Sequence, residues 1–148
     1  MKIKYLYYFL ILITLNSCGD SPFLNEESPA NEVVGNQNLN AEGLPLNGEQ
    51  LKIQPFWREG PFVLNQSRLL IVVTDFEGVP VSPELELKVM LWMPDMGHGS
   101  FPVDVVEIDE GVFEAKEIFF TMPGYWDIHF QLTQREEVLE EVKWPLNL

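Results

Sequence analysis

Residues 93–99, with the sequence Met-Pro-Asp-Met-Gly-His-Gly, carry the side chains of this chain that are best suited to bind a metal. Met93 and Met96 each offer a thioether sulfur, and His98 offers an imidazole nitrogen. Soft sulfur donors combined with imidazole favour copper(I) over zinc. The glycines on both sides of His98 would let the backbone turn so that the imidazole meets the two sulfurs. The sequence therefore predicts a copper(I) site in this loop.

The same residues also have a structural interpretation. Met93 continues the alternation of the apolar residues before it, so it could fill a gap at the end of a core strand. The glycines beside His98 could mark a tight turn with a solvated imidazole. Met122 lies in a turn before a later strand and is the best candidate for a further metal ligand, with core packing as its alternative.

The elements that must position this loop have the pattern of β-strands. Apolar and polar residues alternate over residues 84–93 and again over 125–133, and a period of two indicates strands with two distinct faces. β-Branched and aromatic runs bounded by turn residues predict the other strands. The expected strands are 51–57, 68–76, 84–93, 103–108, 112–120, 125–133 and 138–144.

Six or seven short strands without a convincing helix predict an all-β domain. We expect an immunoglobulin-like β-sandwich of antiparallel strands, with a small barrel as the alternative. His129 falls on the polar face of its strand, as Met90 does in an earlier strand. We expect this histidine to be solvated, with a role as a metal ligand as the alternative. The expected core residues are Leu70, Val72, Leu87, Val89, Leu91, Trp126, Ile128 and Phe130.

Residues 1–17 have the features of a bacterial lipoprotein signal peptide. Lys2 and Lys4 precede an apolar run that is too short to span a ~30 Å hydrocarbon core as a helix. The run ends in Leu-Asn-Ser-Cys, which resembles a lipobox, and Cys18 is the only cysteine of the chain. We therefore expect lipidation of Cys18 rather than catalysis or an intrachain disulfide. An ordinary signal peptide with an incidental cysteine is the alternative.

Residues 18–50 are rich in Asn, Glu, Ser, Pro and Gly and predict a flexible tether to a folded domain at 51–148. Cleavage would remove Lys2 and Lys4 from 9 basic residues, leaving 7 against 23 acidic residues and a net charge of −16. Such a surface repels nucleic acid. The expected location is a bacterial cell envelope, facing the periplasm, with the inner and outer membranes both open.

The domain resembles a known family. It is similar to YtkA-like and FixH-like domains of bacterial envelope proteins. The similarity lies in the order of four features: a strand, a Met-Pro-x-Met-Gly-His loop, a hairpin that ends in Gly, and a strand that begins with Met-x-Gly-x-Trp. This resemblance covers residues 68–132. It implies an immunoglobulin-like sandwich, membrane attachment and a link to copper handling or haem–copper oxidase assembly. The matching residues are Met93, Pro94, Met96, Gly97, His98, Met122, Gly124, Trp126, Ile128 and Phe130.

The sequence carries no motif of a known type of active site, and we expect a protein that is not an enzyme. It has no Gly-x-Ser-x-Gly nucleophile turn, no His-Glu-x-x-His zinc motif and no phosphate-binding glycine loop. Two other functions stay open. One is an interaction module without metal, anchored on a partner by exposed Trp57, Trp92 or Tyr125. The other is an accessory subunit of an efflux or oxidase assembly in the envelope.

Overall fold

The computed structural model describes residues 43–148, and all regular elements in this part of the chain are strands. The predicted signal peptide, the lipidated Cys18 and residues 18–42 of the predicted tether lie outside the described residues. No helix in the described part is long and apolar enough to cross a membrane. The strands are β1 Leu44–Leu46, β2 Leu51–Glu59, β3 Gln66–Asp75, β4 Glu86–Met93, β5 His98–Gly99, β6 Asp104–Asp109, β7 Val112–Phe119, β8 Tyr125–Gln134 and β9 Glu137–Asn147.

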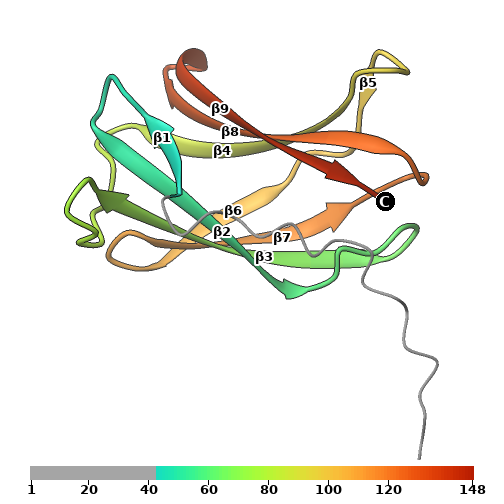
Figure 1. The fold of residues 1–148 in the computed structure, drawn as a ribbon, viewed down its shortest axis with the longest axis horizontal. Coiled ribbons are helices and arrows are strands. Elements are labelled where there is room, and N and C mark those ends of the chain that lie inside the picture. Colours follow the sequence, from blue (N-terminus) through green and yellow to red (C-terminus); the bar gives the residue numbers. More distant parts are fainter. Residues whose placement is uncertain (1–42) are drawn as a thin grey trace, which may run out of the picture. The chain divides into compact units, whose positions relative to one another are not determined.

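The strands form two antiparallel sheets that pack face to face (Figure 1). One sheet has the order β1-β2-β3-β7-β6, and the other has the order β5-β4-β8-β9. The arrangement β2-β3-β7-β6 opposite β4-β8-β9 is the strand order of an immunoglobulin constant-type sandwich. The predicted all-β sandwich is thus confirmed. The structure adds two strands to the predicted seven, and both are too short to show a period in the sequence: β1 has three residues and β5 has two.

Strand β1 corrects one boundary of the sequence interpretation. It lies within residues 18–50, which the composition assigned to the tether, but it pairs with β2 in register Leu46↔Leu51. Leu46 is fully buried in the core. The folded domain therefore includes residues before Leu51, because a strand of three residues can be held by a neighbouring strand without any alternation of its own.

The core lies between the two sheets and includes six of the eight predicted core residues: Leu87, Val89, Leu91, Trp126, Ile128 and Phe130. The prediction for Leu70 and Val72 was wrong, since both are half-buried on the outer face of β3. The residues between and beside them, Leu69, Ile71 and Val73, are fully buried instead. The run from Leu69 to Val73 is apolar throughout, so the sequence gives no alternation from which to choose the inward face.

An aromatic cluster fills one part of the core and corrects the prediction for Trp57. This residue is not an exposed anchor, because its ring packs against Phe120 and Trp144 with centroid distances of 6.1 and 5.7 Å. Phe120 in turn meets Trp126 edge to face at 5.4 Å. Phe120 and Trp126 lie on either side of the β7–β8 connection, so the cluster fixes both ends of the segment that contains Met122.

Candidate metal centre

The predicted metal-binding loop is a tight hairpin between β4 and β5. Met93 ends β4 and pairs with His98, the first residue of β5. The Met93 carbonyl accepts hydrogen bonds from the backbone N–H groups of Met96 at 3.2 Å and Gly97 at 2.9 Å. Gly97 has φ of +67°, which glycine adopts without steric cost. The chain reverses direction here because Pro94 and Gly97 favour a turn, and β5 then pairs with the end of β4.

The pairing decides which side chains of the motif lie together. Directly opposed residues of an antiparallel pair place their side chains on the same face, with Cβ atoms roughly 4.5–5.5 Å apart. Met93 and His98 therefore share one face, which is the face turned to the core, since Met93 is only 5% exposed. His98 is half-buried, and its Nδ1 lies 3.1 Å from the Gly99 carbonyl oxygen. When Nδ1 donates to this oxygen, the Nε2 lone pair is free for a metal.

The β7–β8 connection meets the hairpin at the same end of the sandwich (Figure 1). A Cβ atom on Gly124 would lie 2.7 Å from the Cε of Met93, so the end of the methionine side chain touches this glycine. Met122 is partly buried against the core, and its carbonyl accepts the Trp126 Nε1–H at 3.1 Å. The Met93 side chain thus touches Gly124, which is two residues after Met122 in the sequence.

The hairpin turn also acts electrostatically on the start of β8. Burial raises the pKa of the Tyr125 hydroxyl, the charge and hydrogen bond of Asp127 raise it further, and the charge of Asp95 adds to them. Asp95 belongs to the hairpin turn, so its effect on Tyr125 agrees with a turn that lies close to the β7–β8 connection.

Met96 differs from the other predicted ligands. It lies at the tip of the turn and is 58% exposed. The structure therefore brings Met93, His98 and Met122 to one end of the sandwich, where Met96 is at the exposed tip of the turn. Within residues 43–148, no three His, Cys, Asp or Glu side chains are grouped so that they could hold a metal ion.

The model of the YtkA-like family matches residues 58–131, which is half of the 148-residue chain. The chain belongs to the YtkA-like family. The matched range of this YtkA-like protein runs from the end of β2 into β8 and includes the hairpin, Met122 and both histidines. The match does not extend to the FixH-like part of the resemblance. A comparison with curated proteins gives no match.

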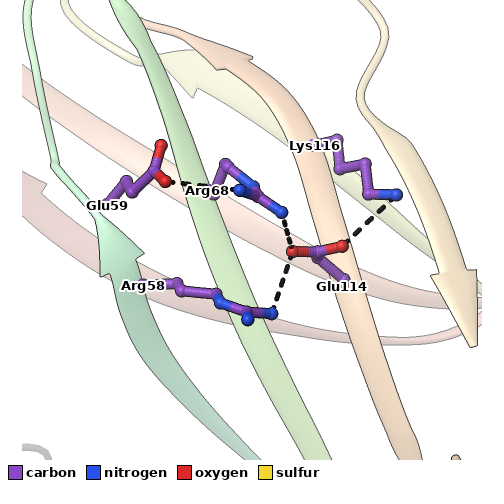
Figure 2. Close-up of polar contacts among 5 residues, drawn as sticks. All are labelled: Arg58, Glu59, Arg68, Glu114 and Lys116. Carbon is purple, nitrogen blue, oxygen red and sulfur yellow. Dashed lines mark hydrogen bonds and ion pairs between the residues drawn. The ribbon is translucent and has the colours of Figure 1, made fainter. Parts of the chain in front are cut away.

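The YtkA-like domain carries a buried carboxylate on the outer face of its five-stranded sheet (Figure 2). Glu114 in β7 is buried, and its Oε1 accepts hydrogen bonds from Arg68 at 2.5 Å and Arg58 at 3.3 Å. Lys116 approaches the other oxygen, Oε2, at 3.3 Å. Arg68 also contacts Glu59 at 3.3 Å. Because both oxygens of Glu114 have cationic partners, this cluster ties β2, β3 and β7 together.

The partners of Glu114 control its ionisation. Burial alone would raise the pKa of the Glu114 carboxyl, but hydrogen bonds from Lys116 and Arg68, with their charges, outweigh burial and hold it below its ordinary value. The same pair raises the pKa of the Arg68 guanidinium, chiefly through the hydrogen bond to Glu114. The carboxylate is therefore ionised at neutral pH, as a structural ion-pair centre requires.

The structure corrects the prediction that His129 is a solvated surface histidine. Its side chain is on the outward side of β8, as the alternation indicated, but it is 5% exposed. Its Nδ1 is hydrogen-bonded to Glu141 on β9. The strand order places β8 between β4 and β9, so His129 has Met90 directly opposite on one side and Lys143 on the other. No sequence signal joins His129 to Glu141, because only the register of two strands makes them neighbours.

Proposed function

We propose that this protein is a lipid-anchored domain of a bacterial cell envelope that faces the periplasm and binds copper(I) to buffer it or hand it over. The proposed ligands are Met93, His98 and Met122, with Met96 as an outer ligand. The observation that supports this proposal most directly is the Met93↔His98 pair, which places a thioether and an imidazole on one face at the end of β4. Copper(I) favours this combination of donors.

The surroundings of the pair also suit a soft, singly charged ion. Met93 reaches Gly124, and Met122 packs in the same segment, so a second thioether is available from the neighbouring connection. Met96 is exposed and has three rotatable bonds, so its sulfur can meet an incoming ion and then turn toward the hairpin. An ion held in this way could pass to a partner protein if a ligand of the partner first replaced Met96.

The envelope location is proposed from the start of the chain. The charged beginning, the apolar run and the lipobox-like Leu-Asn-Ser-Cys sequence favour export and acylation of Cys18. The net charge of −16 after cleavage, counted above, raises the local concentration of cations near the domain without selecting among them. Selectivity for copper(I) would come from the sulfur ligands alone.

A copper(I) titration of the full chain tests the proposal. Cys18→Ser is introduced so that a free thiol cannot bind the metal, and a colorimetric chelator competes under reducing conditions. We expect His98→Ala and Met96→Ala to weaken uptake while both variants stay folded. Asp95→Asn is the matched control, because it lies in the same turn but offers only oxygen. Uptake that is identical in all three variants and in the parent chain would contradict a copper site in the hairpin.

A second candidate is an interaction module without metal, and one observation favours it. The outer face of the five-stranded sheet has a cross-strand row of Phe56, Leu70, Glu114 and Val106, in which Phe56 and Val106 are exposed. Exposed apolar side chains that gather on one face can mark a protein-binding surface. Replacement of Phe56 and Val106 by serine would abolish cross-linking to an envelope partner and leave copper uptake unchanged. An unchanged cross-linking pattern would argue against this surface.

A further inference from the structure

One ring nitrogen of His129 has no hydrogen-bond partner among the described residues 43–148. The histidine is 95% buried in β8, an inner strand of the four-stranded sheet. Its Nδ1 is engaged by Glu141, but Nε2 is buried and makes no hydrogen bond in this part of the chain. Buried polar atoms are nearly always paired, so an unpaired one calls for a reason.

The contact with Glu141 selects one tautomer of the neutral ring. An ionised carboxylate can only accept, so Nδ1 carries the proton and donates it. In the neutral imidazole, Nε2 then has a free lone pair. Histidines that bind metals are commonly held in this way, with the second ring nitrogen donating to a carboxylate.

A soft donor lies on the other side of His129. Met90 on β4 is its direct register partner, so the two side chains share the outer face with Cβ atoms roughly 4.5–5.5 Å apart. Glu141 holds Nδ1 on the β9 side of the ring. Strand β4, with Met90, borders His129 on the side away from β9. The register therefore places a thioether and the Nε2 lone pair on one face of adjacent strands, where rotation of the Met90 side chain can bring the sulfur to the nitrogen.

We propose that His129 Nε2 and Met90 Sδ form a second site for a soft monovalent cation, copper(I) in the cell, on the outer face of the four-stranded sheet. This site is distinct from the hairpin, because Met93 lies on the inner face of β4 and Met90 on its outer face. Imidazole and thioether suit copper(I), and within residues 43–148 no three His, Cys, Asp or Glu side chains are grouped as a zinc or calcium site would need. Glu141 is a positioning residue that orients the ring.

An ion can reach this site without opening the sheet. Met90, beside His129 on the outer face, is 38% exposed. A rotation of its flexible side chain uncovers Nε2 and supplies the sulfur at the same time. Lys143, the other register partner of His129, is exposed, so its ammonium group can extend into water, while Glu141 and Asp127 supply negative charge on the same face.

Silver(I), a redox-stable substitute for copper(I), tests the site by NMR of the imidazole nitrogens in the full chain with Cys18→Ser. The chain has only two histidines, so one set of signals reports each site, and His98→Gln identifies the signals of His129. We expect silver(I) to shift the His129 Nε2 resonance in the parent chain and in His98→Gln. Met90→Leu should weaken this binding about tenfold or more, and Glu141→Gln about 10–100-fold. Met96→Leu, a matched change at the hairpin, should leave it unaltered.

The outcomes separate this site from the hairpin. A shift of His98 without a shift of His129 would overturn the second site and leave the proposed function standing. A shift of His129 alone would support the second site and count against the hairpin. A His129 shift that Met90→Leu does not weaken would remove Met90 from the site. Met90→Leu keeps the volume and apolar character of the side chain, so this variant stays informative even if substitutions of His129 prevent folding.

Discussion

The two histidines of this chain are held in different ways. His98 is half-buried, lies inside a motif of chemically suggestive neighbours, and has as its polar contact the carbonyl of the next residue, Gly99. His129 has no such motif around it in the sequence, yet it is buried and its ring is fixed by a carboxylate from another strand. The conspicuous histidine is the more loosely positioned one, and the inconspicuous one is oriented as metal ligands usually are.

The difference teaches that sequence neighbours and structural neighbours carry separate information. The hairpin groups its donors along the chain, so its geometry depends on one turn. The His129 group is assembled by the register of β4, β8 and β9, so a shift of one residue in either pairing would dismantle it. Both regions share strand β4, with Met93 on its inner face and Met90 on its outer face. Substitutions on each face of β4 would show how independent the two regions are.

Met93→Ala should have the largest effect on stability. Met93 is a core residue as well as a proposed ligand, and truncation of a buried methionine typically costs about 2–5 kcal/mol. Urea unfolding measures the change, and Met93→Leu, which keeps the volume, should cost less than about 1.5 kcal/mol. Met93→Leu should nevertheless weaken copper(I) binding at the hairpin and leave the His129 signals unchanged. If Met93→Leu also weakened metal binding at His129, the two faces of β4 would be coupled.

Gly124→Ala should come second, at about 1–3 kcal/mol, the usual cost of adding a methyl group to a filled site. The new Cβ would lie 2.7 Å from Met93 Cε, and the residue has φ of +136°, a conformation that alanine rarely adopts. Gly97→Ala separates the two causes, because Gly97 also has positive φ but no atom lies within 4 Å of its added Cβ. If both variants lose equal stability by thermal unfolding, backbone strain rather than the Met93 contact explains the loss.

Glu114→Gln should have a smaller effect, because exposed cations with solvent-screened charges surround the carboxylate. Glu114 provides a reference for His129, since Glu114 has partners at both oxygens, whereas one ring nitrogen of His129 has no partner within residues 43–148. The folded-state pKa of Glu114 is below its ordinary value of 4.5. Its stabilisation is therefore fully present above that pH and is lost as the pH falls through the lowered folded-state pKa.

The test is a comparison of unfolding free energies for Glu114→Gln and the parent chain across the acid range. The gap should be constant at neutral pH and should narrow below about pH 4.5. Glu137→Gln serves as the control, because Glu137 is an exposed glutamate at the start of β9. A gap that does not narrow in acid would mean that packing of the side chain, rather than its charge, is what Glu114 contributes.

The sequence predicts the fold better than it predicts the sites, for a physical reason. Strands β4 and β8 alternate, so their period revealed both the strands and their inward residues, including Trp126 and Ile128. The inward face of β3 could not be read, because all residues from Leu69 to Val73 are apolar. Strands β1 and β5 exist because neighbours hold them, which no local pattern records.

The candidate sites depend on pairing between strands. The motif located the hairpin, but it could not show that Met93 faces the core with His98 or that Met96 is exposed at the tip of the turn. The contact of Met93 with Gly124 and the contact of His129 with Glu141 each join segments from different strands. Such contacts follow from sheet order and register, which an isolated sequence leaves open.

Met96→Ala should have the smallest effect on stability and is therefore the most specific test of the hairpin. The residue is 58% exposed at a turn tip, and surface substitutions of this kind usually change the free energy of unfolding by less than about 0.5 kcal/mol. If Met96 is the outer ligand of copper(I), the variant should release the ion faster in a stopped-flow chelator assay, with unfolding unchanged. If the variant and the parent chain released copper(I) at the same rate, the hairpin site would consist of inner-face ligands without Met96. Delivery of the ion would then require Met93 or His98 to leave the core side of the sheet.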